Sequence, residues 1–128
     1  MIQIPCQMSK SLFSALLYLS ATSLTPAAAA EAKAYVIQEI QVTDAAKFKA
    51  YADQAPATVA AFGGVFIVRR GAVSVLSGAP PAGGVVVLEF PSMAKAKAWH
   101  ESPAYHNILP IRDANSTSRV YIVEGVAP

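Results

Sequence analysis

Cysteine and charge are both scarce in this chain of 128 residues. A single cysteine excludes a disulfide-stapled domain and the usual cysteine-based metal sites. Charged residues make up 14% of the sequence and leave a net charge of +2, too little for a nucleic-acid-binding surface. Hydrophobic residues reach 54%, which excludes a disordered chain, because such chains lack the apolar residues needed for collapse. The length fits one folded domain.

Residues 1–30 have the composition of an export signal. Lys10 is their only charge, an apolar run over residues 12–24 follows it, and alanines occupy positions 27–30. We therefore predict a secretory signal peptide cleaved before Glu31, with Met8 as an alternative start, and a periplasmic or secreted protein. The alternative is a retained membrane helix, but the run of about thirteen residues is shorter than the ~20 that span a bilayer. We expect no stable membrane anchor after cleavage.

Residues 31–128 are predicted to form a single α+β domain. Residues 34–42 alternate between two faces, which predicts a strand. Apolar residues then recur every three or four positions up to Phe62, which predicts a helix capped by Thr43 or Asp44. Pro56 is expected to kink or restart this helix, and Gly63-Gly64 to end it.

The second half of the domain continues this alternation of strands and helices. The pattern predicts a ferredoxin-like β-α-β-β-α-β order with an antiparallel sheet and a hairpin extension after the second strand. Two helices cover only one face of such a sheet, so the other, largely apolar face must meet a partner or enclose a ligand. The expected elements are strands at 65–69, 73–76, 85–90 and 119–124, a helix after Pro91-Ser92, and a short one from Ser102-Pro103 through Ile108, bent or ended by Pro110.

Five short motifs occur in a fixed order between Lys33 and Gly125. They are Tyr35-Val-Ile, Phe62-Gly-Gly, Arg69-x-Gly, Val87-x-Glu-Phe-Pro-Ser and Trp99-His-x-Ser-Pro-x-Tyr105. This ordered set resembles the bacterial family called domain of unknown function 1330, within the dimeric α+β barrel superfamily. The resemblance implies a homodimer in which two four-stranded sheets face each other, and a pocket between sheet and helices in each subunit.

Relatives in that superfamily include heme-degrading and quinone-forming monooxygenases, a lactone isomerase and stress-responsive small proteins. The export signal departs from the pattern of the family, whose members are mostly cytoplasmic. The resemblance thus implies small-molecule chemistry without fixing a substrate, because one fold hosts unrelated functions.

Glu89 is the most informative single position in the sequence. It interrupts the apolar run of the predicted strand 85–90, where an ionised carboxylate is costly unless it is paired. Arg69 and Arg119, each on another strand, are the expected partners. Two interpretations follow: a structural ion pair that fixes strand register or the dimer, or a general base or substrate anchor.

Histidines and tyrosines supply the remaining candidates. His100 and His106 flank the helix break without a metal-ligand spacing, so no metal site is expected. His100 is a candidate acid or base and His106 a candidate ligand contact, unless both are surface or capping residues. Tyr35 and Tyr105 either pack in the core or line a pocket. Arg112 either binds an anionic group or is a solvated charge at a helix end.

The sequence contains neither a G-x-S-x-G nucleophile motif nor a phosphate-binding glycine loop. We therefore predict an exported homodimer that binds a small, partly apolar molecule. By the superfamily resemblance, any reaction would be cofactor-free oxygenation or isomerisation, with Glu89 or a histidine moving the proton. The alternative is a non-catalytic, stress-related binding or structural module.

Overall fold

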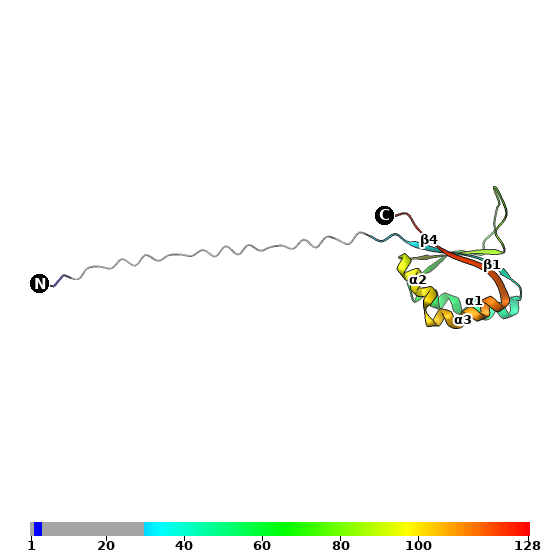
Figure 1. The fold of residues 1–128 in the computed structure, drawn as a ribbon, viewed down its shortest axis with the longest axis horizontal. Helices are drawn as coiled ribbons and strands as arrows, with labels where there is room; N and C mark the ends of the chain where they lie inside the picture. The colour runs from blue at the N-terminus through cyan, green and yellow to red at the C-terminus, as the bar shows by residue number, and fades with distance from the viewer. Residues whose placement is uncertain (1, 4–29) are drawn as a thin grey trace.

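The computed structural model describes residues 2–3 and 30–128, so the predicted signal peptide lies almost wholly outside the described residues. No helix in the described part is long and apolar enough to cross a membrane. The domain runs through β1 (Ala34–Val42), α1 (Ala45–Ala60), β2 (Val65–Arg69), β3 (Gly84–Phe90), α2 (Met93–Glu101), α3 (Pro103–Asn115) and β4 (Ser116–Glu124) (Figure 1).

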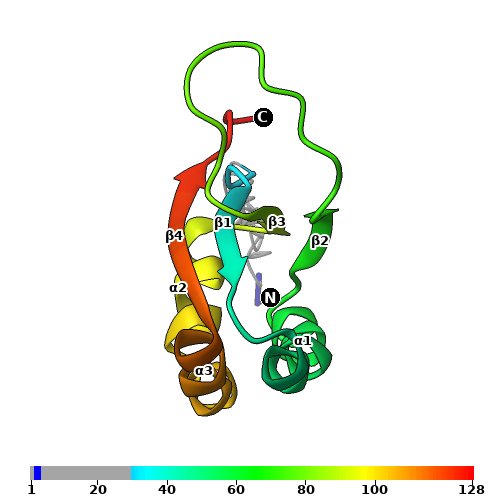
Figure 2. The same cartoon turned by 90° about the vertical axis from the view of Figure 1, so that its right-hand side faces the viewer.

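The strands form one antiparallel sheet in the order β2-β3-β1-β4 (Figure 2). All the helices pack on one side of it, and the other side is open (Figure 1). This arrangement confirms the predicted ferredoxin-like α+β fold. In place of the second helix of the β-α-β-β-α-β order, the structure has two consecutive helices, α2 and α3.

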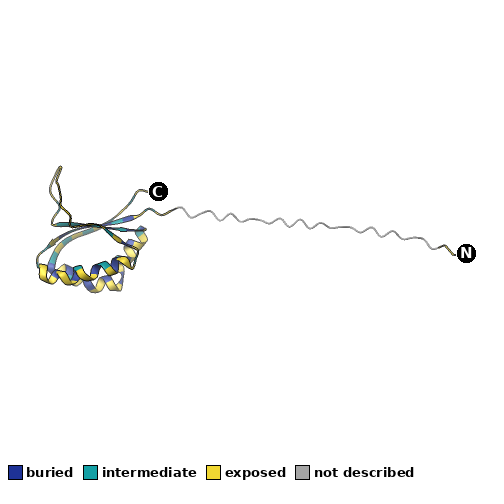
Figure 3. Ribbon diagram, turned by 180° about the vertical axis from the view of Figure 1, so that it is seen from behind, coloured by how far each residue is buried: buried dark blue, intermediate teal, exposed yellow. Residues whose placement is uncertain are grey.

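The core lies between the sheet and the helices, where the buried positions gather (Figure 3). Along β1, Val36, Gln38 and Ile40 are buried against the helices, while Tyr35 and Ile37 alternate with them on the open face. The predicted alternation is therefore confirmed. The largest fully buried side chains are Trp99, Tyr105, Phe90, Leu88, Val36 and Val59.

Side chains cap each helix where the sequence predicted a start. Asp44 accepts a hydrogen bond from the Lys47 backbone N–H at 3.0 Å, and Ser92 accepts one from Lys95 at 3.1 Å. Ser102 caps α3, which has Pro103 in its first turn. These bonds satisfy backbone donors that the first helical turn leaves free.

The two internal prolines do not end their helices. Helix α1 continues through Pro56 to Ala60, and α3 continues through Pro110 to Asn115 instead of stopping at Ile108. The expectation that Pro110 ends α3 was therefore wrong. A proline removes one backbone hydrogen bond, but the buried face of α3 extends beyond it and holds the last turn against the core.

The predicted strand at 73–76 was also wrong. Residues 70–83 form no strand and instead make an arm that projects from the open side of the sheet (Figure 1). Val73, Val75 and Leu76 are exposed on this arm, with Leu76 96% accessible. An isolated two-stranded hairpin is marginal in water, so the apolar sequence alone does not create a ladder here.

Candidate functional site

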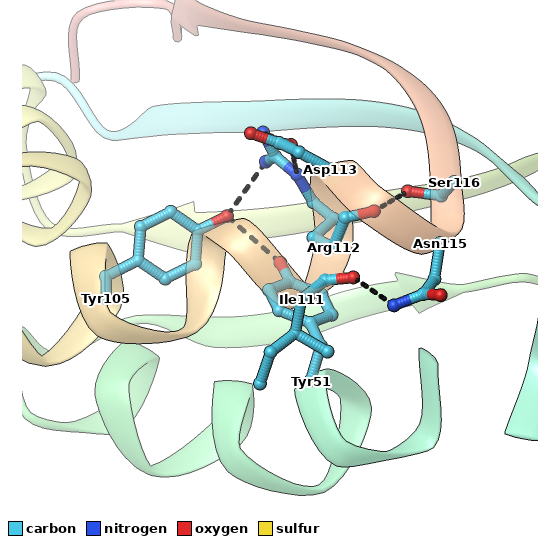
Figure 4. Close-up of polar contacts among 7 residues, drawn as sticks. All are labelled: Tyr51, Tyr105, Ile111, Arg112, Asp113, Asn115 and Ser116. Atoms are coloured by element: carbon cyan, nitrogen blue, oxygen red, sulfur yellow. Dashed lines mark hydrogen bonds and ion pairs between the residues drawn. The ribbon is translucent and has the colours of Figure 1, made fainter. Parts of the chain in front are cut away.

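A chain of polar side chains crosses the apolar layer between the sheet and the helices. Tyr105 is completely buried, and its hydroxyl lies 3.0 Å from that of Tyr51. Arg112 donates a hydrogen bond from Nη1 to the Tyr105 hydroxyl at 3.1 Å. Figure 4 shows the Tyr105 hydroxyl between the guanidinium group and Tyr51. We call Tyr51, Tyr105 and Arg112 the Tyr-Arg cluster.

Helical spacing explains why these side chains meet. Tyr105 and Arg112 are seven residues apart on α3, which is two turns of an α-helix and places both on one face. Tyr51 belongs to the buried face of α1, which packs against α3. Local helical spacing therefore brings Tyr105 and Arg112 together, and the packing of α1 on α3 adds Tyr51.

Burial decides the electrostatics of the cluster. Arg112 is 8% exposed, and its carboxylate partner Asp113, bonded through Nε at 3.0 Å and Nη2 at 2.9 Å, has a side chain 61% exposed. Burial opposes the charge of Arg112, but Tyr105 and Asp113 outweigh it and raise the pKa of Arg112. Burial, and then the neighbouring Tyr105, raises the pKa of Tyr51, so this phenol stays protonated. The interpretation of Arg112 as a solvated charge was wrong.

His100 connects the cluster to the surface. Its ring centroid lies 5.6 Å from that of Tyr105 and 6.3 Å from that of His106. Burial, followed by the charges of Arg112 and His106, lowers the pKa of His100, while Glu101 opposes the shift. His106 is exposed on α3. The two histidines therefore form a polar margin beside Tyr105, with His100 mainly neutral at pH 7.

Glu89 lies on the open face, away from the Tyr-Arg cluster. Its Oε1 is 2.7 Å from Nζ of Lys33, and 24% of its side chain is accessible. Glu89 is thus paired as predicted, but the expectation of an arginine partner was wrong. The pair raises the pKa of Lys33 through the hydrogen bond and the charge of Glu89.

Both arginines that were expected beside Glu89 have other partners. Arg119 is bonded to Glu39 on the open face, and the Arg69 guanidinium lies 4.4 Å from the centroid of the Phe66 ring. Tyr35 is directly opposite Glu89 across β1 and β3. The structure therefore brings Tyr105, His100 and His106 together on one side of the sheet and leaves the other predicted site residues on its open side or edge.

A hollow of about 620 Å³ also lies on the open side, between the arm and the strands. Glu39, Arg119 and residues 79–82 of the arm contribute to its lining. Its two charged groups already neutralise each other. This hollow was not predicted from the sequence, and it offers fewer unpaired hydrogen-bonding groups than the Tyr-Arg cluster.

Tyr51 and Gln38 were not among the residues predicted for the site. Tyr51 was visible as a member of an apolar helical stripe, where its ring alone explains its position. Gln38 falls on the buried side of the alternating strand 34–42, and that polar residue at an inward position was the available signal. Within residues 2–3 and 30–128, no three potential ligands among His, Cys, Asp and Glu gather to hold a metal ion.

Comparison with protein families identifies the chain. Residues 33–126 match the domain of unknown function DUF1330. The chain belongs to the DUF1330 family. No curated protein matches the sequence.

Solved structures support the same fold for this DUF1330 protein. The RPA0582 protein of unknown function from Rhodopseudomonas palustris is 19% identical, with a TM-score of 0.62 over 77% of this chain and 85% of its own. SnoaB, a cofactor-independent oxygenase from Streptomyces nogalater, is 14% identical, with a TM-score of 0.51 over 76% of this chain and 96% of its own.

A Nitrosomonas europaea protein provisionally named an antibiotic biosynthesis monooxygenase is also similar. It is 13% identical, with a TM-score of 0.52 over 77% of this chain and 94% of its own. These similarities show the ferredoxin-like α+β fold that the DUF1330 protein shares with them. At such identities they fix the architecture and not the chemistry.

Proposed function

We propose that this DUF1330 protein binds a small organic molecule at the Tyr-Arg cluster and acts as a homodimer. The burial of Arg112 carries the proposal. A guanidinium group that is 8% exposed and hydrogen-bonded to a fully buried tyrosine is costly for stability alone. A site that binds and orients a ligand repays that cost, and such sites combine apolar walls with a few placed polar groups.

The chemistry that this site supports is proton transfer without a cofactor. Tyr51 keeps its proton and shares a hydrogen bond with Tyr105, while His100, mainly neutral at pH 7, can accept a proton at the margin. SnoaB, which shares the fold, is a cofactor-independent oxygenase. We infer a reaction of this general type, oxygenation or isomerisation, with His100 as the candidate base and Glu89 assigned to the open face.

The open face of the sheet supports the homodimer. Its side chains include Tyr35, Ile37, Val65, Val85, Val87, Tyr121 and Val123. Such a surface is costly in water unless another surface covers it, and a twofold dimer covers it with an identical copy. The arm projects on the same side (Figure 1), and its residues Val75 and Leu76 are exposed, so they could add to the surface that a second copy covers.

We also propose that residues 1–30 direct export and that the mature protein begins at Glu31. Lys10, the apolar run and the alanines support this assignment. Intact-mass measurement of the protein purified from a secreting host tests it. We expect a chain that starts at Glu31; a chain that retains residues 1–30 would contradict cleavage.

A thermal-shift screen tests the binding function. We expect at least one small aromatic or lactone compound to raise the melting temperature, because a ligand present at a hundred times its Kd adds about 2.7 kcal/mol to stability. The shift should shrink in Tyr105→Phe and remain in Tyr121→Phe, which alters an exposed tyrosine of the open face. A flat response across a broad library, or equal shifts in both variants, would contradict binding at the cluster.

A further inference from the structure

The Tyr-Arg cluster contains more hydrogen-bond donors than acceptors. The two phenol oxygens lie 3.0 Å apart, so one of their two protons occupies the bond between them. The Tyr105 oxygen already accepts from Arg112. Whichever phenol donates to the other, the second phenol proton has no acceptor in the described part of the chain.

Gln38 adds a second unmatched donor to the same layer. Its side chain is 3% exposed, and its Nε2 atom has no hydrogen-bond partner among the described residues. It projects from the helix-facing side of β1, directly opposite Val86 and Val120 on the adjacent strands. A buried amide without an acceptor destabilises the fold, so a ligand atom that accepts its hydrogen bond would remove this cost.

The buried layer also carries a positive charge, which favours an anion as its spare hydrogen-bond donors do. Among the buried polar residues of the described part, Arg112 is the charged one, and none is an aspartate or a glutamate. Asp113, which pairs with Arg112, lies mostly in solvent, where its charge is screened. The interior beside Tyr105 is therefore positive and rich in donors.

We propose that the Tyr-Arg cluster binds its ligand through a deprotonated oxygen, so that the ligand is a small organic oxyanion. This inference rests on the proposed function and names the ligand class of that site. An anionic oxygen accepts two or three hydrogen bonds and forms stronger ones than a neutral oxygen does. It satisfies the spare phenol proton, offers Gln38 an acceptor and balances the Arg112 charge, whereas a neutral apolar molecule satisfies none of these.

A phenol that changes colour on ionisation provides the test. 4-Nitrophenol absorbs visible light strongly only as the phenolate. A site that binds the anion preferentially increases the fraction of phenolate, and the absorbance reports this increase. At a pH just below the pKa of the free phenol, we expect added protein to increase the phenolate absorbance. Benzoate, the carboxylate arm of the test, should displace the bound phenolate, and nitrobenzene, which has no acidic oxygen, should not.

Two variants connect this signal to the cluster. Tyr105→Phe should weaken phenolate binding about tenfold or more, because it removes a donor worth roughly 1–3 kcal/mol. Gln38→Leu removes the other spare donor and keeps a well-filled core, so it should weaken binding while the protein remains at least as stable. Tyr121→Phe is the matched control and should bind like the wild type.

The outcomes separate this inference from the proposed function. Nitrobenzene binding as tightly as the phenolate, or a decrease in phenolate absorbance on binding, overturns the oxyanion and retains small-molecule binding. If none of the probes binds, the oxyanion proposal is also wrong. The thermal-shift screen then decides whether the protein binds a small molecule at the cluster. Full phenolate binding in Gln38→Leu and Tyr105→Phe places the anion outside the cluster and overturns the assignment.

Discussion

The two faces of the sheet balance their charges in opposite ways. On the open face, the carboxylates of Glu39 and Glu89 are paired with Arg119 and Lys33. In the helix-covered layer, Arg112 is buried without a buried carboxylate. The carboxylates of the open face are therefore paired on a surface that lacks an apolar cover. On the covered side, Arg112 is paired with Asp113, whose side chain lies mostly in solvent.

This difference suits each face to a separate one of the two proposed roles. An apolar surface with neutralised charges is suited to bury against a copy of itself, since no charge is left without a partner in the interface. A packed layer is suited to a small polar ligand when it holds spare hydrogen-bond donors and a buried cation such as Arg112, whose carboxylate partner Asp113 lies mostly in solvent. Association and ligand binding should therefore respond to different substitutions.

The largest expected effect is the loss of the dimer in Val87→Asp. Val87 lies on the open face opposite Ile37, so a carboxylate there would be buried against the partner at a cost of several kcal/mol. Each 1.4 kcal/mol is about tenfold in the dissociation constant, which predicts a monomer at micromolar concentration. Light scattering of the purified protein measures the change.

Ala50→Asp is the control for this substitution, because it adds the same charge at an exposed position of α1. The control should remain dimeric. A wild-type monomer at the same concentration, or a dimer that survives in Val87→Asp, would remove the association role from the open face.

The next effect is a loss of stability in Tyr105→Phe. The substitution leaves Nη1 of Arg112 and the hydroxyl of Tyr51 without their buried partner, which should lower the free energy of unfolding by about 1–3 kcal/mol. Tyr121→Phe makes the same chemical change on the open face and should shift stability by less than about 0.5 kcal/mol. Urea denaturation compares the two, and equal losses would mean that the cluster is not a coupled network.

Local patterns predicted most of the fold. The alternation of residues 34–42 gave the two faces of β1, and Asp44, Ser92 and Ser102 marked the helix starts. Each of these signals acts within a few residues, so neighbouring sequence is enough to identify it. The end of α3 at Asn115 was missed because tertiary packing outweighed the helix-breaking tendency of Pro110.

The partner of Glu89 was beyond local reasoning. A bulge between Phe66 and Val68 shifts the register, so that Arg69 lies opposite Val86 rather than on the face that Glu89 shares. Strand β1 separates β4 from β3, which places Arg119 beside Glu39 instead. Strand order and bulges follow from long-range pairing, which residue types do not reveal.

The interpretation of Arg112 as a solvated charge was wrong for a related reason. The buried positions of α3 are Tyr105, Ile108, Arg112 and Asn115, a regular helical stripe whose second half is polar. A search for apolar periodicity stops at Ile108, whereas the spacing itself continues. The burial of Arg112 was therefore missed, because a polar stripe does not follow the hydrophobic pattern.

Glu89→Gln tests whether the open-face ion pairs are structural or chemical. Lys33 is largely exposed, so the pair should contribute little to the free energy of unfolding. We expect Glu89→Gln to fold, to dimerise and to bind the phenolate probe like the wild type, as measured by denaturation, light scattering and absorbance. Loss of probe binding with an intact fold would return Glu89 to the site and contradict the separation of the two faces.

The smallest effect is a pH dependence that comes from His100. Its pKa lies below the ordinary value of 6.5, so the folded state binds fewer protons than the unfolded state and loses stability as the pH falls through that range. His100→Gln removes this loss, and the melting temperatures of the two proteins should differ more at pH 5 than at pH 8. His106→Gln is the comparison variant: it removes a smaller cause of the His100 pKa shift than burial or Arg112, so most of the acid-induced loss should remain. Burial and the Arg112 charge cause the lowered pKa of His100, so Arg112→Gln should also reduce the loss of stability at low pH. If His100→Gln loses as much stability at low pH as the wild type, the positive field of Arg112 does not extend to the margin of the cluster.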